Sequence, residues 1–91
     1  MLVSIGHNYF MESDRVVAIL EPNSSPSKKK KRDAAEKGLI IDARGGGPTR
    51  SLLILDTNHV ILCSLQAETL KSRLNANAFK RERNVSSNDG P

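Results

Sequence analysis

Residues 38–64 constrain the fold of this 91-residue chain more than any other stretch. They contain three short apolar runs, at 39–41, 51–55 and 59–63, separated by a glycine-rich segment and a polar turn. Each run is too short for an ordinary helix and is bounded by Gly, Pro, Asn or Asp, so the pattern predicts strands. Residues 56–58 supply the turn that joins the last two runs as a hairpin. We therefore predict a three-stranded antiparallel core.

The predicted hairpin is apolar on both of its faces. Successive side chains leave opposite faces of a strand, and neither of its runs alternates apolar with polar residues. A chain of this size buries only roughly 60% of its unfolded surface, and just two short helices are expected to cover the hairpin. We therefore predict a homo-oligomer, in which another copy of the chain covers hairpin side chains from Leu53, Leu55, Val60 and Leu62.

The N-terminal part adds strands and one helix to this core. Apolar or alternating runs at 2–5, 9–11 and 15–21 predict three further strands. Ser24 or Ser25, followed by Pro26, is typical of a helix start. The helix is expected to run to Lys37 and to end at Gly38 in a left-handed conformation.

The C-terminal part predicts a second helix and a polar tail. Ala67, Leu70 and Leu74 recur on one helical face after the hairpin. From about Asn75 onward the chain becomes polar. We expect a single α+β domain over residues 1–75 and a polar, disordered tail over 76–91.

The positive charge is concentrated in one run. The chain has 14 Lys and Arg against 10 Asp and Glu, a formal net charge of +4. Five of the 14 are Lys28, Lys29, Lys30, Lys31 and Arg32, so the remainder balances at 9 minus 10, or −1. Such a local excess without an apolar amphipathic face favours a nucleic acid partner over a membrane. Aromatic residues make up only 3%, which disfavours RNA recognition by base stacking.

Three interpretations of the basic run are open. The first is a solvated helix face, the second is a short pattern typical of a nuclear localisation signal, and the third is a patch that contacts phosphates. The last interpretation is strengthened if Arg15, Arg44 and Arg50 lie nearby, because phosphate binding depends on several cations acting together.

Catalytic and metal sites find little support. His7 and His59 belong to no spaced set of ligands that could hold a metal, and Cys63 has the apolar neighbours of an inert thiol. The glycines at 45–47 lack the spacing of a nucleotide-binding loop. A catalytic pair of His59 and Asp56 is the enzyme alternative, supported only by their proximity in sequence. We predict no enzyme activity, cofactor, metal or small-molecule substrate.

A single cysteine allows no intrachain disulfide, and this fits a reducing compartment. The chain shows neither the apolar region of a signal peptide nor an apolar run approaching ~20 residues. We therefore expect a cytoplasmic protein.

A series of short motifs in a specific order extends over residues 3–74. They are Ile5-Gly6, Arg15 before an apolar strand, Pro22 with Ser25-Pro26, Gly38-x-Ile40-Ile41-Asp42-Ala43, Gly45 with Thr49-Arg50, Asp56-x-x-His59-Val60-Ile61-Leu62-x-Ser64, and Glu68-Thr69-x-x-x-Arg73-Leu74. In these motifs the chain resembles the RemA-type extracellular-matrix regulatory proteins, which are small bacterial DNA-binding regulators.

The resemblance implies an α+β subunit that assembles into a closed ring and binds double-stranded DNA along a basic surface. It also implies activation of biofilm-matrix and osmoprotection genes in spore-forming bacteria. The family's functional arginine before the third strand is matched by Arg15, its helix-starting proline by Pro26, and the arginine after its glycine loop by Arg50. The arginine pair within that loop is replaced here by Gly47 and Pro48.

Two hypotheses for function follow. In the first, the chain is a DNA-binding regulator in which the dense lysine run takes over phosphate binding from the missing loop arginines. In the second, it is a structural oligomeric assembly protein without specific DNA binding, and its basic face is only solvated.

Overall fold

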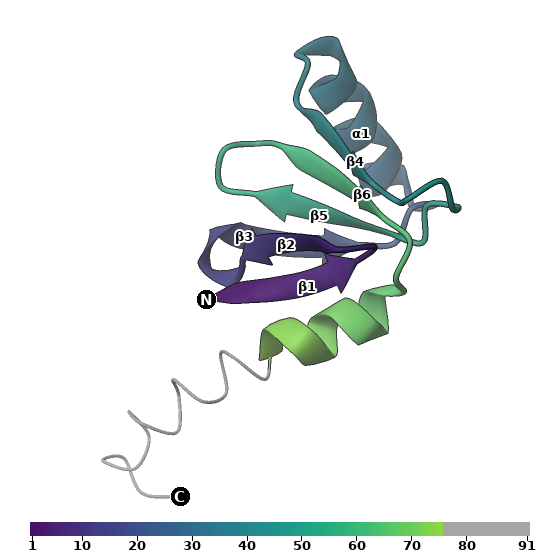
Figure 1. Ribbon diagram of the computed structural model, residues 1–91. Coiled ribbons are helices and arrows are strands. Elements are labelled where there is room, and N and C mark those ends of the chain that lie inside the picture. Colours follow the sequence, from purple (N-terminus) through teal and green to yellow (C-terminus); the bar gives the residue numbers. More distant parts are fainter. Residues whose placement is uncertain (76–91) are drawn as a thin grey trace, which may run out of the picture.

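The computed structural model describes residues 1–75, which form an α+β fold as predicted (Figure 1). The predicted tail at 76–91 lies outside these residues. The elements, in chain order, are β1 (Leu2–Gly6), β2 (Tyr9–Glu12), the 3-10 helix η1 (Ser13–Arg15), β3 (Val16–Leu20), α1 (Ser25–Glu36), β4 (Ile40–Ala43), β5 (Ser51–Leu55), β6 (Val60–Cys63) and a second helix at residues 67–75.

The main sheet has four strands in the order β3-β5-β6-β4. The predicted hairpin is confirmed as the antiparallel pair β5–β6, with Leu53 opposite Ile61. The prediction of a three-stranded antiparallel core is wrong, because β4 lies beside β6 and runs parallel to it. The Val60 N–H donates to the Leu39 carbonyl at 2.9 Å, so both strands start side by side. The glycine-rich segment 44–50 then crosses from β4 to β5. These two strands are not paired, because β6 lies between them.

The two faces of this sheet have separate covers (Figure 1). On the closed face, side chains of the β1–β2 hairpin and of the second helix pack on those of the sheet; its buried residues are Ile5, Met11, Ala43, Leu53, Ile61, Cys63 and Leu70. On the α1 face, helix α1 lies over the opposite side chains; its buried residues are Ala34, Leu52, Ile54, Val60 and Leu62. Each face therefore has its own apolar cluster.

This arrangement corrects the predicted subunit interface. Leu53, Val60 and Leu62 are 0%, 1% and 5% exposed within the single chain, and Leu55 is partly buried. They also point to opposite faces of the sheet, so no one partner surface could reach them all. The prediction overlooked that β1 and β2 form a separate two-stranded sheet, which covers one face of the hairpin.

Helix α1 begins as predicted, and it ends at Glu36, one residue before the predicted end at Lys37. The Ser24 hydroxyl accepts a hydrogen bond from the Ser27 N–H at 3.3 Å, and Pro26 lies in the first turn. Ser27 is fully buried, and its hydroxyl donates to the Glu21 carbonyl. After the helix, Gly38 has a φ of 70°, the left-handed conformation that favours glycine. The start of α1 is therefore fixed against the end of β3.

Candidate nucleic-acid interface

The direction of the strands assigns the candidate cations to two ends of the sheet. Strands β3, β4 and β6 finish where β5 starts, because β5 is antiparallel to β3 and β6. We call this the loop end; it contains residues 21–24, 44–50 and 64–66. The opposite end, with Arg15, the turn at 56–58 and residues 37–39, is the turn end.

At the loop end, Arg44 is fixed by the carboxylate two residues before it. Its Nε and Nη2 donate to the Asp42 oxygens at 2.9 and 2.8 Å, and its Nη1 donates to the Thr49 hydroxyl at 3.2 Å. Hydrogen bonds from Arg44 lower the pKa of Asp42 to about 2, and the same bonds raise the pKa of Arg44. The guanidinium is thus held in one orientation at the base of the glycine-rich segment 44–50, which we call the glycine loop.

Arg50 is the more available arginine at this end. Its backbone N–H donates to the Cys63 carbonyl at 2.8 Å, so the main chain is fixed at the entrance to β5. Its exposed side chain makes no ion pair within residues 1–75. It lines a surface cavity of about 340 Å³ together with Glu21, Asn23 and Glu68. Two carboxylates beside it temper the positive potential there.

Arg15 lies at the turn end, away from Arg44 and Arg50. Its Nε is 3.0 Å from the Asp56 carboxylate, and its carbonyl accepts a hydrogen bond from the Asp56 N–H at 2.9 Å. Both side chains of this ion pair are about half exposed. The structure therefore does not gather the three predicted arginines into one cluster within the chain.

The basic run on α1 is exposed, but its five residues do not share a face. Successive helical residues are rotated by about 100°, so five of them extend around the whole helix. Lys29 pairs with Asp33 at 3.1 Å, and Lys30 lies on the side that faces the sheet. Lys28, Lys31 and Arg32 are exposed and make no ion pair with any residue of the described chain.

The glycine loop has a packing role that sequence reasoning missed. Gly45 has a φ of 63°, and a Cβ added there would lie 2.4 Å from Cγ of His7. Any side chain at this position would collide with the turn between β1 and β2. The loop is thus packed against the N-terminal hairpin.

The alternative catalytic groups have other partners. Nδ1 of His59 lies 2.6 Å from the Thr57 hydroxyl, whereas Asp56 faces Arg15, so the proposed His59–Asp56 pair is not formed. Burial raises the pKa of the Cys63 thiol to about 11, which leaves it protonated near neutral pH. Within residues 1–75, His, Cys, Asp and Glu side chains nowhere gather in threes that could hold a metal ion.

Several polar contacts of the loop end and the second helix were also missed. Arg44 and Asp42 are two residues apart, and this short spacing on an edge strand was the available signal. The contact of Arg73 with the Ser4 carbonyl, at 2.9 Å, joins segments 69 residues apart and leaves no local signal.

In the part of the chain that the structure covers, no helix combines the length and hydropathy needed to cross a bilayer.

Comparison with known proteins agrees with the resemblance in the sequence. The profile of the RemA-like family, described as Extracellular matrix regulatory protein A-like, matches residues 2–74. A relative from Fervidobacterium nodosum is 49% identical over 72 residues, which are 79% of this chain and 77% of the relative. One from Nitratidesulfovibrio vulgaris is 46% identical over 79% of this chain and 82% of its own length. One from Thermotoga maritima is 44% identical over 90% and 89%.

Each of these three relatives is named "Putative regulatory protein". The matched residues include α1, both sheets and nearly all of the second helix. The chain therefore belongs to the RemA-like family of extracellular-matrix regulatory proteins.

Proposed function

We propose that this chain is a non-enzymatic, DNA-binding transcriptional regulator. It acts as a homo-oligomer whose repeated basic surface contacts the phosphates of double-stranded DNA. The family description and the names of the relatives support a regulatory role, and the description points to extracellular-matrix genes as the class of target.

The observation that carries this proposal is the set of unpaired cations on α1. Lys28, Lys31 and Arg32 are exposed, and none has an ion-pair partner among residues 1–75. Such cations can neutralise phosphates and release counterions, which supplies most of the sequence-independent affinity for DNA. They also take the place of the arginine pair that the glycine loop lacks.

The arginines add contacts at both ends of the sheet. Arg50 has no ion-pair partner among the described residues, whereas Arg15 and Arg44 are each paired with a carboxylate. Water screens such ion pairs at the protein surface, so they contribute little to stability, and a DNA phosphate can replace the carboxylate. Each subunit thus offers several small basic patches, and repetition in an oligomer raises the overall affinity through avidity.

The assembly surface is proposed to lie on the exposed apolar side chains. Leu2 and Phe10 of the β1–β2 hairpin are 67% and 61% exposed, and Val17 on the edge strand β3 is 63% exposed. Water-exposed side chains of this size favour burial against a second copy of the chain. The same observation favours the second candidate function, a structural assembly protein without specific DNA binding.

Titration of a labelled DNA duplex at several salt concentrations separates the two functions. A regulator binds at low salt and loses affinity steeply as salt rises. In the Lys28→Gln/Lys31→Gln variant, the log–log slope should fall by about 0.9 for each phosphate that the protein no longer neutralises. Lys71→Glu is the matched control, because it also lowers the net charge from +4 to +2 but lies on the second helix, which covers the opposite face of the sheet. It should retain the original slope.

One result would overturn DNA binding itself, and another would overturn its assignment to the cations of α1. Absence of binding at low salt favours the assembly protein. Binding with an unchanged slope in the Lys28→Gln/Lys31→Gln variant makes the basic run a solvated face, and Arg15 and Arg50 become the residues to test.

Sedimentation velocity tests the assembly surface. The unaltered chain should sediment as an oligomer, and Phe10→Asp should dissociate it because a buried carboxylate is unfavourable in an apolar contact. Ser72→Asp adds the same charge on the exposed side of the second helix and should leave the oligomer intact. A folded monomer of the unaltered chain contradicts the homo-oligomer.

A further inference from the structure

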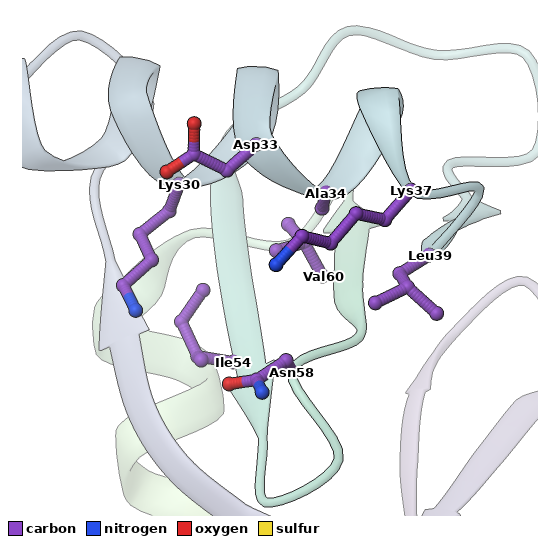
Figure 2. A pocket seen from close by; sticks show the side chains of 8 residues that line it. All are labelled: Lys30, Asp33, Ala34, Lys37, Leu39, Ile54, Asn58 and Val60. Atoms are coloured by element: carbon purple, nitrogen blue, oxygen red, sulfur yellow. The ribbon is translucent and has the colours of Figure 1, made fainter.

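A small cavity lies between α1 and the β5–β6 hairpin (Figure 2). Its volume is about 150 Å³. The apolar lining comes from Ala34 on the helix, Leu39 before β4, Ile54 on β5 and Val60 on β6. Three of these side chains are 5% exposed or less, so the floor of the cavity belongs to the core of the α1 face.

The sequence of α1 explains why the space is left open. The residues that line the cavity are at positions 30, 33, 34 and 37, which share one side of a helix. Ala34 is the only buried apolar residue of α1, and its single methyl group does not reach the space that a leucine would fill. The rest of that side consists of two lysines and an aspartate.

The rim of the cavity is cationic. Lys30 and Lys37 extend from α1 toward the hairpin (Figure 2) and make no ion pair with any residue from 1 to 75. Asp33 is the one carboxylate in the lining, and in Figure 2 it points away from Asn58. It is held at 3.1 Å by Lys29, whose hydrogen bond lowers its pKa. Two ammonium groups are thus available at the opening.

Asn58 completes the rim from the turn between β5 and β6. Its φ is 71°, and its N–H donates to the Leu55 carbonyl at 3.0 Å. In Figure 2 the carboxamide lies beside Ile54, on the side of the cavity opposite the helix. The amide can donate a hydrogen bond to an acceptor at the opening.

We propose that this cavity binds a small organic monoanion with a compact apolar body, such as an aromatic or branched aliphatic carboxylate. A cavity of about 150 Å³ is large enough for one benzene ring. The body lies on Ala34, Ile54 and Val60, while the carboxylate at the open rim accepts charge-assisted hydrogen bonds from Lys30 and Lys37. This binding is separate from DNA binding and is measured without DNA.

Benzoate is the probe, and NMR of the ¹⁵N-labelled full chain is the measurement. Benzoate should produce saturable shifts at the amides of Ala34, Asn58 and Val60. Benzamide has the same shape without the charge, and inorganic phosphate has the charge without the apolar body. Both should bind about tenfold more weakly, since each lacks one of the two contributions.

Three variants locate the binding, with Lys31→Gln as the matched control. Lys37→Gln should weaken benzoate binding about tenfold, because it removes an ammonium from the rim. Asn58→Gly keeps the left-handed turn and should weaken binding about threefold. Asp33→Asn should strengthen it, because the only carboxylate in the lining is removed. Lys31 does not line the cavity, so Lys31→Gln should leave the affinity unchanged.

Each contrary result overturns the proposal. Equal binding of benzamide or phosphate means that charge and apolar body are not both recognised. An equal reduction in Lys31→Gln and Lys37→Gln means that benzoate responds only to the overall charge of the helix. The absence of saturable shifts with millimolar benzoate means that the cavity takes no such ligand.

Discussion

The two faces of the main sheet are covered by segments of opposite character. On the closed face, Ile5, Met11 and Leu70 are large side chains that interdigitate with the strands. On the α1 face, the helix contributes one buried methyl group from Ala34 and otherwise presents lysines. Large side chains fill the space between elements and a short one does not, which explains the cavity beneath the helix.

Stability and binding therefore depend on different parts of the molecule. Dense apolar packing contributes most of the free energy of folding, whereas exposed lysines contribute little to it. We therefore expect substitutions on the closed face mainly to lower the free energy of unfolding. Substitutions on the outer side of α1 should mainly weaken ligand binding. Four predictions test this division, in order of decreasing effect on stability.

Leu70→Ala should have the largest effect. Leu70 is 0% exposed and packs on the closed face, so its truncation removes transfer free energy and leaves a cavity. We expect a decrease of about 2–5 kcal/mol in the free energy of unfolding, measured by urea denaturation. Leu74→Ala, at a half-buried position on the same helix, should cost less. A decrease below about 1 kcal/mol for Leu70→Ala would falsify the assignment of stability to this face.

Cys63 should make the closed face sensitive to alkaline pH. Burial raises the pKa of its thiol from 9.0 to about 11. Between these values the folded state keeps a proton that the unfolded chain has released. Stability should therefore fall as pH rises from 9 toward 11, by at most about 1.4 kcal/mol per pH unit.

Urea denaturation across this pH range measures the effect, with Cys63→Ala as the control. The variant should be less stable at every pH because it loses a buried side-chain atom, but it lacks the thiol and should lose stability less steeply above pH 9. Parallel curves for the two proteins would show that other groups cause the decline.

Ser24→Ala should have a moderate effect on the α1 face. The Ser24 hydroxyl accepts the hydrogen bond from the Ser27 N–H that starts the helix. Loss of a helix cap costs about 1 kcal/mol, which lowers the melting temperature of a domain of this size by roughly 4–8 °C. Circular dichroism measures the shift, and Ser25→Ala is the control because the cap hydrogen bond is accepted by the Ser24 hydroxyl and not by that of Ser25. Equal shifts in both variants would argue against the cap.

The Lys28→Gln/Lys31→Gln variant should have the smallest effect on stability. Both lysines are exposed and lack ion-pair partners within residues 1–75, so the free energy of unfolding should change by less than about 0.5 kcal/mol. Thermal unfolding alongside the DNA titration checks this. A large destabilisation would mean that these lysines act on folding and would remove the division between the two faces.

Local signals in the sequence predicted most elements correctly. The Ser24 cap, the left-handed Gly38 and the polar turn at 56–58 each act within a few residues, so their effect can be read without the fold. The parallel pairing of β4 with β6 could not be predicted in this way, because the 44–50 segment is also compatible with a hairpin between β4 and β5. The cover from the β1–β2 hairpin was missed because it depends on contacts between segments far apart in the sequence.

Of the candidate site, the structure shows that Lys28 to Arg32 are exposed. Their role in DNA binding stays a prediction. The separation of Arg15 from Arg50 depends on pairing: each precedes a strand, and β3 and β5 are antiparallel neighbours, so the two arginines must lie at opposite ends. The cavity beneath α1 had a signal in the spacing of Lys30, Ala34 and Lys37, but its other wall comes from distant strands.

The strand order also has a consequence for how the chain folds during its synthesis. β3 and β4 occupy opposite edges of the sheet, and each pairs only with a strand that comes later in the sequence, β5 or β6. When α1 has left the ribosome, neither edge strand has a partner, and the sheet cannot form until the β5–β6 hairpin inserts between them. We expect the emerging chain to contain little beyond the local β1–β2 hairpin and a transient helix until residue 63 is free. The main sheet should then form in one late cooperative step.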